Sequence, residues 1–201
     1  MIVELLLLIC ISYLIGAIPT GYLIGKIFYK RDIREEGSGN VGSTNMYRIF
    51  GFVPGLITQL FDIGKGIFVV LVIPLFMVNP IELSISYPLL FGTSAFLGNM
   101  RHGKGVNISF GVFMCLFPIE TIFSLLFFLL CLFMTKYVSL SSMVSMVVFT
   151  IIMATEYILY GKPIDLTLIS IFIILFTMLD KHSDNVKRLL EQKEPKINFK
   201  I

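Results

Sequence analysis

Long apolar stretches constrain this chain more than any other feature of its sequence. Five of them reach or approach the length of about 20 residues that a helix needs to cross a bilayer, namely 2–25, 52–78, 85–100, 137–160 and 164–180. Only 14% of the residues are charged, and the mean hydropathy is +0.89. We therefore expect an all-α, polytopic membrane protein rather than a soluble domain.

A sixth apolar stretch, residues 105–135, is long for a single crossing. The sequence FPIE at 117–120 divides it, so the stretch forms either one tilted helix or a hairpin with a short first arm. The hairpin gives seven helical segments in all, and the alternative is five full spans plus a re-entrant hairpin. We find no repeat and no low-complexity linker, and we expect a single domain over residues 1–201.

Basic residues indicate the orientation of the chain. Lys and Arg gather in residues 26–48, in 101–104 and in the tail at 181–201, and such residues are enriched in cytoplasmic loops. All three regions lie on one face only if an even number of crossings separates Lys104 from Lys181, which favours the hairpin. We expect the N-terminus outside and the C-terminus in the cytoplasm.

Three polar stretches share this predicted cytoplasmic face. They are GSGNVGSTNMYR at 37–48, GNMRHGKG at 98–105 and KHSDNVKRL at 181–189. Segments far apart in sequence that converge at the mouth of a helix bundle are typical of an active site. Because all three are rich in groups that bind anions, we expect an anionic substrate.

The glycines of the first stretch indicate a phosphate-binding loop. Gly37, Gly39 and Gly42 fit the pattern G-x-G-x-x-G, but a dinucleotide-binding fold needs a preceding strand, whereas this segment joins two apolar helices. Glycines also let successive backbone N–H groups surround an anion, and Ser43 or Thr44 could cap the helix that follows. The alternative is a polar loop that only joins two spans.

Side chains at helical spacing add to this picture in the first and third stretches. Asn45 and Arg48 would share one helix face, which supplies an amide and a guanidinium suited to phosphate. In the third stretch His182, Asn185 and Arg188 would likewise line one face. The second stretch offers Arg101 and Lys104 beside flexible glycines. Each stretch alone could be a solvated helix end.

Other polar residues lie within the apolar segments. Asp62 and Lys65 are three residues apart in the second span, where they form either a structural ion pair or part of the catalytic machinery. Cys10, Cys115 and Cys131 lie in apolar runs without a C-x-x-C pair or a neighbouring His, so we expect buried, inert thiols and no metal site.

Taken in order, five segments resemble one known family. DIREEGSGNVGSTNMYR, FDIGKG, HGKGV, KYVSLSS and KHSDNVKRLLEQKEPK are similar to the motifs of bacterial membrane glycerol-3-phosphate acyltransferases that use acyl phosphate as donor. The resemblance implies a multi-pass enzyme of the bacterial inner or cell membrane that acylates the 1-hydroxyl of glycerol 3-phosphate. The products would be lysophosphatidic acid and phosphate, the first step of phospholipid synthesis.

The resemblance also implies which residues act. In the first motif these are Ser38, Asn40, Thr44, Asn45 and Arg48, in the second Gly103, Lys104 and Gly105, and in the third His182, Asn185, Arg188 and Glu194. The second motif departs from the family pattern, because Asn99 replaces a His, several residues that include Phe-Pro are missing, and His102 replaces a glycine. The glycines of this motif are associated with glycerol 3-phosphate binding.

The chemistry of such a reaction suits these residues. Acyl phosphate is already activated, so the enzyme has to hold two phosphate-bearing molecules together and offset their repulsion, for which Arg48, Lys104 and Arg188 are suited. Ser38 is expected to donate a hydrogen bond rather than act as a nucleophile, and either His182 or a substrate phosphate oxygen could accept the hydroxyl proton. No cofactor is expected. A silent, lipid-precursor-binding relative and a transporter of phosphate compounds are the alternatives.

Overall fold

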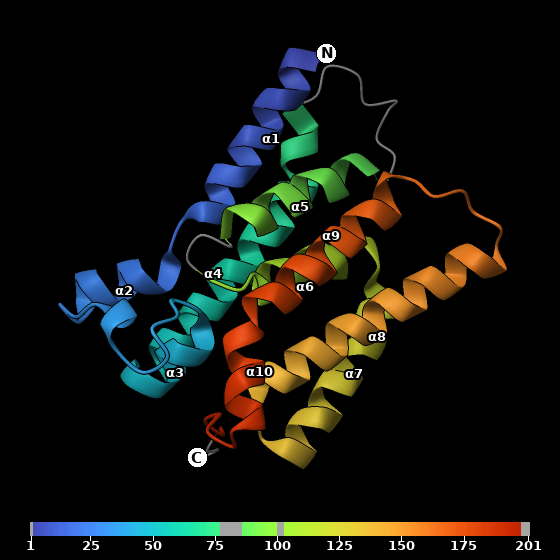
Figure 1. Cartoon of the computed structure of the whole chain (residues 1–201). Coiled ribbons are helices and arrows are strands. Elements are labelled where there is room, and N and C mark those ends of the chain that lie inside the picture. Colours follow the sequence, from blue (N-terminus) through green and yellow to red (C-terminus); the bar gives the residue numbers. More distant parts are fainter. Residues whose placement is uncertain (1, 77–85, 100–102, 198–201) are drawn as a thin grey trace. The chain divides into compact units, whose positions relative to one another are not determined.

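The computed structural model describes residues 2–76, 86–99 and 103–197. Its first part holds α1 (Ile2–Ala17), α2 (Thr20–Phe28), the 3-10 helix η1 (Ile33–Glu35), α3 (Ser43–Phe50), α4 (Phe52–Leu71), the 3-10 helix η2 (Ile73–Phe76), α5 (Ser86–Asn99) and α6 (Val106–Leu116). Then follow α7 (Pro118–Thr135), α8 (Val138–Leu159), α9 (Leu166–Lys181) and α10 (Ser183–Leu190). The all-α prediction is thus confirmed over the described residues (Figure 1).

Prolines divide two of the predicted apolar segments. Segment 2–25 is not one helix, because α1 ends before Pro19 and α2 leaves at an angle of 44° to it. In 105–135 the break falls where FPIE predicted it, with Phe117 at the N-cap of α7 and Pro118 at its first position. A single continuous helix over 105–135 is therefore excluded.

The apolar helices differ in their capacity to cross a membrane. Among the described residues, three helices are long and apolar enough to cross by themselves, Phe52–Phe76, Pro118–Thr135 and Val138–Leu159. Up to five crossings result if the bent pairs α1–α2 and α9–α10 each count as one span. Since α6 has only 11 residues, the number and direction of the crossings stay a prediction.

The chain divides into two compact units, and the first covers residues 1–116. Within it α1 packs along α5, and α4 packs along α6 and α3. Two glycines allow the approach of α1 and α5, because a Cβ on Gly98 would overlap the carbonyl oxygen of Tyr13 and a Cβ on Gly16 that of Ala95. Because these two residues have no side chain, the C-terminal ends of α1 and α5 can pack with their backbones in contact.

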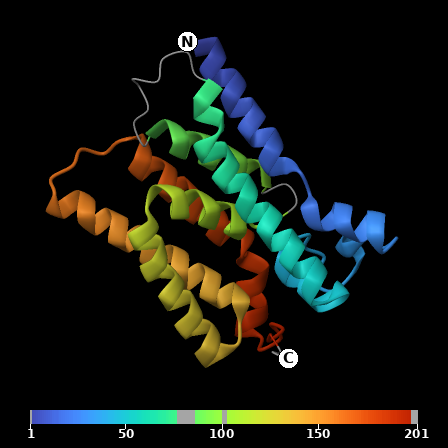
Figure 2. The ribbon, with the colours of Figure 1, turned by 180° about the vertical axis from the view of Figure 1, so that it is seen from behind.

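The second unit covers residues 117–201. Within it α7 packs along α8, and α8 contacts α9 and α10 (Figure 2). The tail after α10 turns back, so that the backbone N–H of Ile197 donates to the carbonyl oxygen of Lys136 at 2.9 Å. The tail is therefore held against the α7–α8 connection.

The expectation of buried cysteines is wrong. Cys10 is exposed on α1, and Cys115 and Cys131 are half-buried. Apolar side chains of a membrane helix can face lipid as well as protein, so a place in an apolar run does not imply burial within the protein.

Candidate active site

The first polar loop is organised around a small apolar core of its own. Ile33, Val41 and Met46 are buried together, with Tyr22 and Phe50 packed against them. These side chains fix both ends of the loop beneath its polar surface, so residues 37–42 are held in a defined conformation.

Asn45 ties this loop together from within. Its side chain is 1% exposed, and its Oδ1 accepts from the backbone N–H of Ser38 at 3.1 Å. Its Nδ2 donates to the carbonyl oxygens of Glu36 at 3.0 Å and Asn40 at 2.9 Å. Gly37 has φ of +60°, a conformation that favours glycine. The side chain of Asn45 therefore shapes the loop from below.

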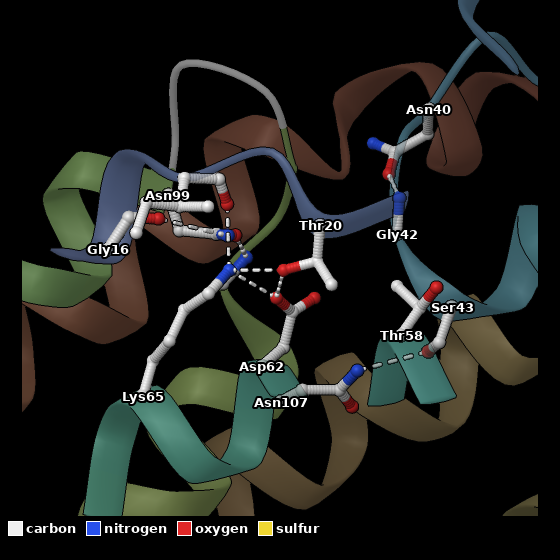
Figure 3. A network of polar contacts seen from close by, with 12 residues as sticks. Gly16, Thr20, Asn40, Gly42, Ser43, Thr58, Asp62, Lys65, Asn99 and Asn107 are labelled. Carbon is white, nitrogen blue, oxygen red and sulfur yellow. Dashed lines mark hydrogen bonds and ion pairs between the residues drawn. The ribbon is translucent and has the colours of Figure 1, made fainter. Parts of the chain in front are cut away.

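The start of α3 differs from the prediction. Neither Ser43 nor Thr44 caps the helix, because Gly42 occupies the N-cap in an extended conformation, and its N–H donates to Asn40 Oδ1 at 2.7 Å. The hydroxyl oxygen of Ser43 instead accepts from Nδ2 of Asn107 on α6 at 3.0 Å (Figure 3). This bond joins the first loop to the segment that follows the second loop.

The predicted face of Asn45 and Arg48 is divided between the interior and solvent. Asn45 is buried, whereas Arg48 is exposed in the last turn of α3. Ser38 and Gly39 are exposed on the loop, and Thr44 is half-buried. Exposed groups here are thus the Ser38 hydroxyl and the Arg48 guanidinium, which are suited to an anion. The predicted backbone donors differ, because the N–H groups of Ser38, Gly39 and Gly42 donate to acceptors within the loop.

Asp62 and Lys65 form a buried ion pair beneath the bend between α1 and α2. Lys65 Nζ lies 2.6 Å from Asp62 Oδ1 and donates to the hydroxyl oxygen of Thr20 at 2.6 Å and to the carbonyl oxygen of Ile18 at 2.7 Å. Thr20 in turn donates to Asp62 Oδ1 at 2.9 Å (Figure 3). Of the two predicted roles, the contacts favour the structural one.

The second loop is closed by Asn99 at the end of α5. The backbone N–H of Gly103 donates to the carbonyl oxygen of Asn99 at 2.8 Å, and the N–H of Gly105 donates to Asn99 Oδ1 at 3.0 Å. Lys104 is half-buried between the two glycines, and Gly105 has φ of +72°. Arg101 lies outside the described residues.

In the third stretch, His182 lies where α9 ends and α10 begins, at a bend of 49°. Its side chain is 2% exposed, and Nδ1 lies 2.7 Å from the carbonyl oxygen of Met178. A carbonyl oxygen can only accept, so Nδ1 carries a hydrogen and Nε2 is the unprotonated nitrogen of the neutral ring.

Glu194 gathers the other residues of this stretch. Its carboxylate accepts from Ser139 Oγ at 2.6 Å and Asn185 Nδ2 at 2.7 Å on one oxygen, and from Arg188 Nε at 2.8 Å on the other. Burial alone would raise the pKa of Glu194, but these three hydrogen bonds, with the charge of Arg188, outweigh it and lower the pKa below its ordinary value. Glu194 is therefore an ionised residue inside the unit.

The structure thus brings the predicted residues together in two groups. The first unit holds the first and second loops, joined through Ser43 and Asn107, and the second unit holds His182, Asn185, Arg188 and Glu194. Convergence of all three stretches involves both units and stays a prediction. No group of three His, Cys, Asp or Glu side chains that could hold a metal ion occurs among residues 2–76, 86–99 and 103–197.

Sequence reasoning missed three polar partners: Thr20, Asn107 and Ser139. Each is a small polar residue at or near the start of a helix, a position where a hydrogen bond from its side chain is expected. What the sequence does not indicate is the partner, which lies 42, 64 and 55 residues away, respectively.

Comparison with known proteins identifies the family of this chain. A family model for glycerol-3-phosphate acyltransferase matches residues 6–192. Glycerol-3-phosphate acyltransferases of Macrococcus caseolyticus and Listeria monocytogenes are 37% and 38% identical to this chain, covering 98% and 99% of it and 99% and 100% of their own lengths. Glycerol-3-phosphate acyltransferase 2 of Bacillus anthracis is 38% identical over 96% of this chain and 98% of its own.

Solved structures of the same family resemble this chain as well. The chain is similar to PlsY (YgiH), an integral membrane glycerol 3-phosphate acyltransferase, in its glycerol 3-phosphate form, with a TM-score of 0.82 and 28% identity over 96% of both chains. The lysophosphatidic acid form gives 0.78 and 28%, over 96% of this chain and 95% of that one. Fold and relatives define a multi-pass integral membrane acyltransferase. This chain belongs to the glycerol-3-phosphate acyltransferase family, which confirms the resemblance seen in its motifs.

Proposed function

We propose that this chain transfers a fatty acyl group from acyl phosphate to the 1-hydroxyl of sn-glycerol 3-phosphate, giving lysophosphatidic acid and phosphate. Family membership supports the acyltransferase reaction and its acceptor. The proposal extends this to acyl phosphate as the donor, to a bacterial cell membrane as the location, and to a site that faces the cytoplasm, as the basic loops predict.

The observation that carries the proposal is the first loop, held from below by buried Asn45, with Ser38 and Arg48 exposed above it. A loop held in a fixed conformation that presents a hydroxyl and a guanidinium can bind a phosphate without reorganising when it arrives. In the proposed site Gly37, Gly39, Asn40, Gly42 and Thr44 shape or line this loop, and Arg48 binds phosphate.

The reaction needs positioning and charge more than a covalent intermediate. The 1-hydroxyl oxygen of glycerol 3-phosphate attacks the acyl carbonyl carbon, a new C–O ester bond forms, and the C–O bond to the phosphate breaks so that inorganic phosphate leaves. Arg48, Lys104 and Arg188 offset the charges of the two phosphate groups. Ser38 donates a hydrogen bond in this scheme, because no base adjoins it in sequence.

The proton of the attacking hydroxyl has two possible acceptors. Nε2 of His182 is suited, since Nδ1 already donates to the Met178 carbonyl oxygen and Nε2 of the neutral ring can accept a proton. A phosphate oxygen of the substrate is the other. In either case Asn185 and Glu194 position Arg188, because Glu194 accepts from both residues.

Donor specificity tests this function. Purified protein in detergent is given labelled glycerol 3-phosphate with palmitoyl phosphate or, separately, with palmitoyl-coenzyme A. We expect labelled lysophosphatidic acid only with palmitoyl phosphate. Product formed from the thioester alone would contradict acyl phosphate as the donor and leave the family assignment intact.

Single substitutions test the proposed charges. Arg48→Ala and Lys104→Ala should each raise KM for glycerol 3-phosphate at least about tenfold, because an ionic hydrogen bond contributes about 1.5–3 kcal/mol. The yield of folded protein should not change, since Arg48 is exposed and Lys104 half-buried. Wild-type kinetics in both variants would remove these residues from the site.

A further inference from the structure

We propose that Asn99 is a positioning residue that fixes the backbone on both sides of Lys104 and thereby sets the affinity for glycerol 3-phosphate. This inference rests on the proposed function, because it assigns a role in substrate use to the shortened second loop. Asn99 occupies the place at which the sequence departs from the family pattern.

Both glycines that flank Lys104 donate their backbone N–H to the same residue, Asn99. The N–H of Gly103 donates to the backbone oxygen of Asn99 at 2.8 Å, and the N–H of Gly105 donates to its side-chain Oδ1 at 3.0 Å. Asn99 itself is 7% exposed. The backbone on both sides of Lys104 is therefore tied to one buried residue, by its main-chain oxygen before Lys104 and by its side-chain oxygen after it.

Gly103 is fitted to this amide. A Cβ built on Gly103 would lie 2.7 Å from Asn99 Oδ1, 3.5 Å from its Cγ and 3.7 Å from its Nδ2, so the three nearest atoms all belong to Asn99. Any side chain at position 103 would thus push the Asn99 amide away from Gly105. The φ of Gly103 is not positive, so an alanine there avoids the strain of a left-handed backbone.

The amide is also anchored on its other side. Asn99 Nδ2 lies 3.5 Å from the carbonyl oxygen of Gly16, at the end of α1 (Figure 3). The close approach of α1 and α5 through Gly16 and Gly98 brings the two together. On the far side of the loop, the carbonyl oxygen of Gly105 accepts from both the N–H and the Oγ of Ser109, at 2.9 Å each, so α6 begins rigidly after Lys104.

A lysine held in this way loses little freedom when an anion binds, and a site that is ordered in advance binds more tightly than one that must be ordered. Removing the Asn99 side chain takes this acceptor from the Gly105 N–H, so the backbone next to Lys104 is less firmly held. The effect should therefore fall on the affinity for the anion that Lys104 contacts and not on the acyl phosphate or the chemical step.

The first test is the separation of kinetic constants in Asn99→Ala. We expect KM for glycerol 3-phosphate to rise about tenfold, the equivalent of one buried hydrogen bond, with kcat and KM for palmitoyl phosphate within about twofold of wild type. Ser12→Ala is the matched control, because it removes another buried hydrogen bond of the same unit, from Ser12 Oγ to the Leu8 oxygen at 2.8 Å. The control should leave both KM values unchanged.

The second test is a double-mutant cycle with Gly103→Ala. Alone, Gly103→Ala should also raise KM for glycerol 3-phosphate about tenfold, because it displaces the Asn99 amide. In the Asn99→Ala background it should add less than about twofold, since the atoms it would meet are gone. If the two effects instead multiply to about a hundredfold, Asn99 and Gly103 act independently, and the proposal is wrong.

The remaining outcomes are also decisive. If Asn99→Ala lowers the yield of folded protein, Gly103→Ala decides alone, because it keeps Asn99, and an unchanged KM for glycerol 3-phosphate in it overturns the proposal. An equal rise of both KM values in Asn99→Ala would indicate general destabilisation and also overturn it. Wild-type protein without acyl transfer would contradict the proposed function, whereas active wild type with insensitive variants contradicts only the role of Asn99.

Discussion

Single buried amides organise both loops of the first unit. The side chain of Asn45 joins three backbone groups of the first loop. That of Asn99 accepts from the Gly105 N–H of the second loop, and the main-chain oxygen of Asn99 accepts from the Gly103 N–H. An asparagine can donate and accept at once, so one side chain satisfies backbone N–H and C=O groups that would otherwise lack partners away from water. In this family fold, the polar residues of the motifs therefore include residues that hold the loop as well as exposed ones that can meet substrate.

Asn45→Ala tests this account of the first loop. The substitution removes the acceptor of the Ser38 N–H and one donor each to the carbonyl oxygens of Glu36 and Asn40, so we expect the free energy of unfolding to fall by about 1–3 kcal/mol and activity to be lost. Thermal unfolding in detergent measures the first and lysophosphatidic acid formation the second. Asn40→Ala, which removes the single side-chain bond to the Gly42 N–H, should cost less. Equal melting temperatures for wild type and Asn45→Ala would contradict the account.

The pKa of Glu194 leads to a prediction about pH. Hydrogen bonds from Ser139, Asn185 and Arg188 outweigh burial and hold its pKa below the ordinary 4.5. A carboxyl whose pKa is lower in the folded state stabilises that state fully above its unfolded pKa, and the contribution is lost as the pH falls through the folded value. Thermal stability should therefore drop on acidification below about pH 4.5.

The variant Glu194→Gln isolates this residue. It cannot ionise, and its amide can place only one oxygen where the carboxylate accepts from Ser139, Asn185 and Arg188, so we expect lower stability than wild type at pH 7 and a smaller further loss as the pH falls from about 5 to below 4. Melting curves over this range decide the question. Parallel curves for the two proteins would show that another group causes the pH dependence.

The bend between α1 and α2 depends on a charge network in the neighbouring helix. Lys65 and Asp62 of α4 hold Thr20 and the carbonyl oxygen of Ile18, one residue on either side of Pro19. The next residue, Gly21, lies so close to Val41 that a Cβ would overlap the Val41 oxygen. The network thus supports the first loop through the start of α2.

Lys65→Met tests whether this network is structural. Removing the cation leaves the Asp62 carboxylate buried without its ion partner, which typically costs about 3–5 kcal/mol. We expect a large fall in melting temperature, with partial recovery when Asp62→Asn is added, because the uncompensated charge is then gone. Lys187→Met, at an exposed lysine, is the control and should melt like wild type. A melting temperature of Lys65→Met equal to that of the wild type would contradict the structural role.

The sequence predicted the elements better than their contacts. Apolar runs and the prolines of 17–20 and 117–120 contain enough local information to locate helices and the break at Phe117, although the break at Pro19 was missed. The sequence also indicated the three polar stretches as candidate anion-binding segments. Their partners were not, because the bond of Glu194 to Ser139 depends on the chain reversal at Gln192, whose φ is +56°, and on the packing of α10 against α8.

The whole chain offers a test of orientation. Basic loops predict that the N-terminus and the loop at 160–165 are outside and that the tail is in the cytoplasm. A reporter inserted at Lys162 should be found outside the membrane, and a reporter fused after Ile201 should be found in the cytoplasm. Both reporters on the same side would contradict seven segments and would require one crossing fewer or more between α8 and the tail.

The central claim is that this chain is an acyl-phosphate-dependent glycerol-3-phosphate acyltransferase despite its shortened second motif. The most direct measurement is phosphate release from palmitoyl phosphate by the purified protein, with and without glycerol 3-phosphate. We predict release that depends on glycerol 3-phosphate and matches the lysophosphatidic acid formed mole for mole. Folded protein that releases no phosphate, or releases it equally without the acceptor, would contradict the claim.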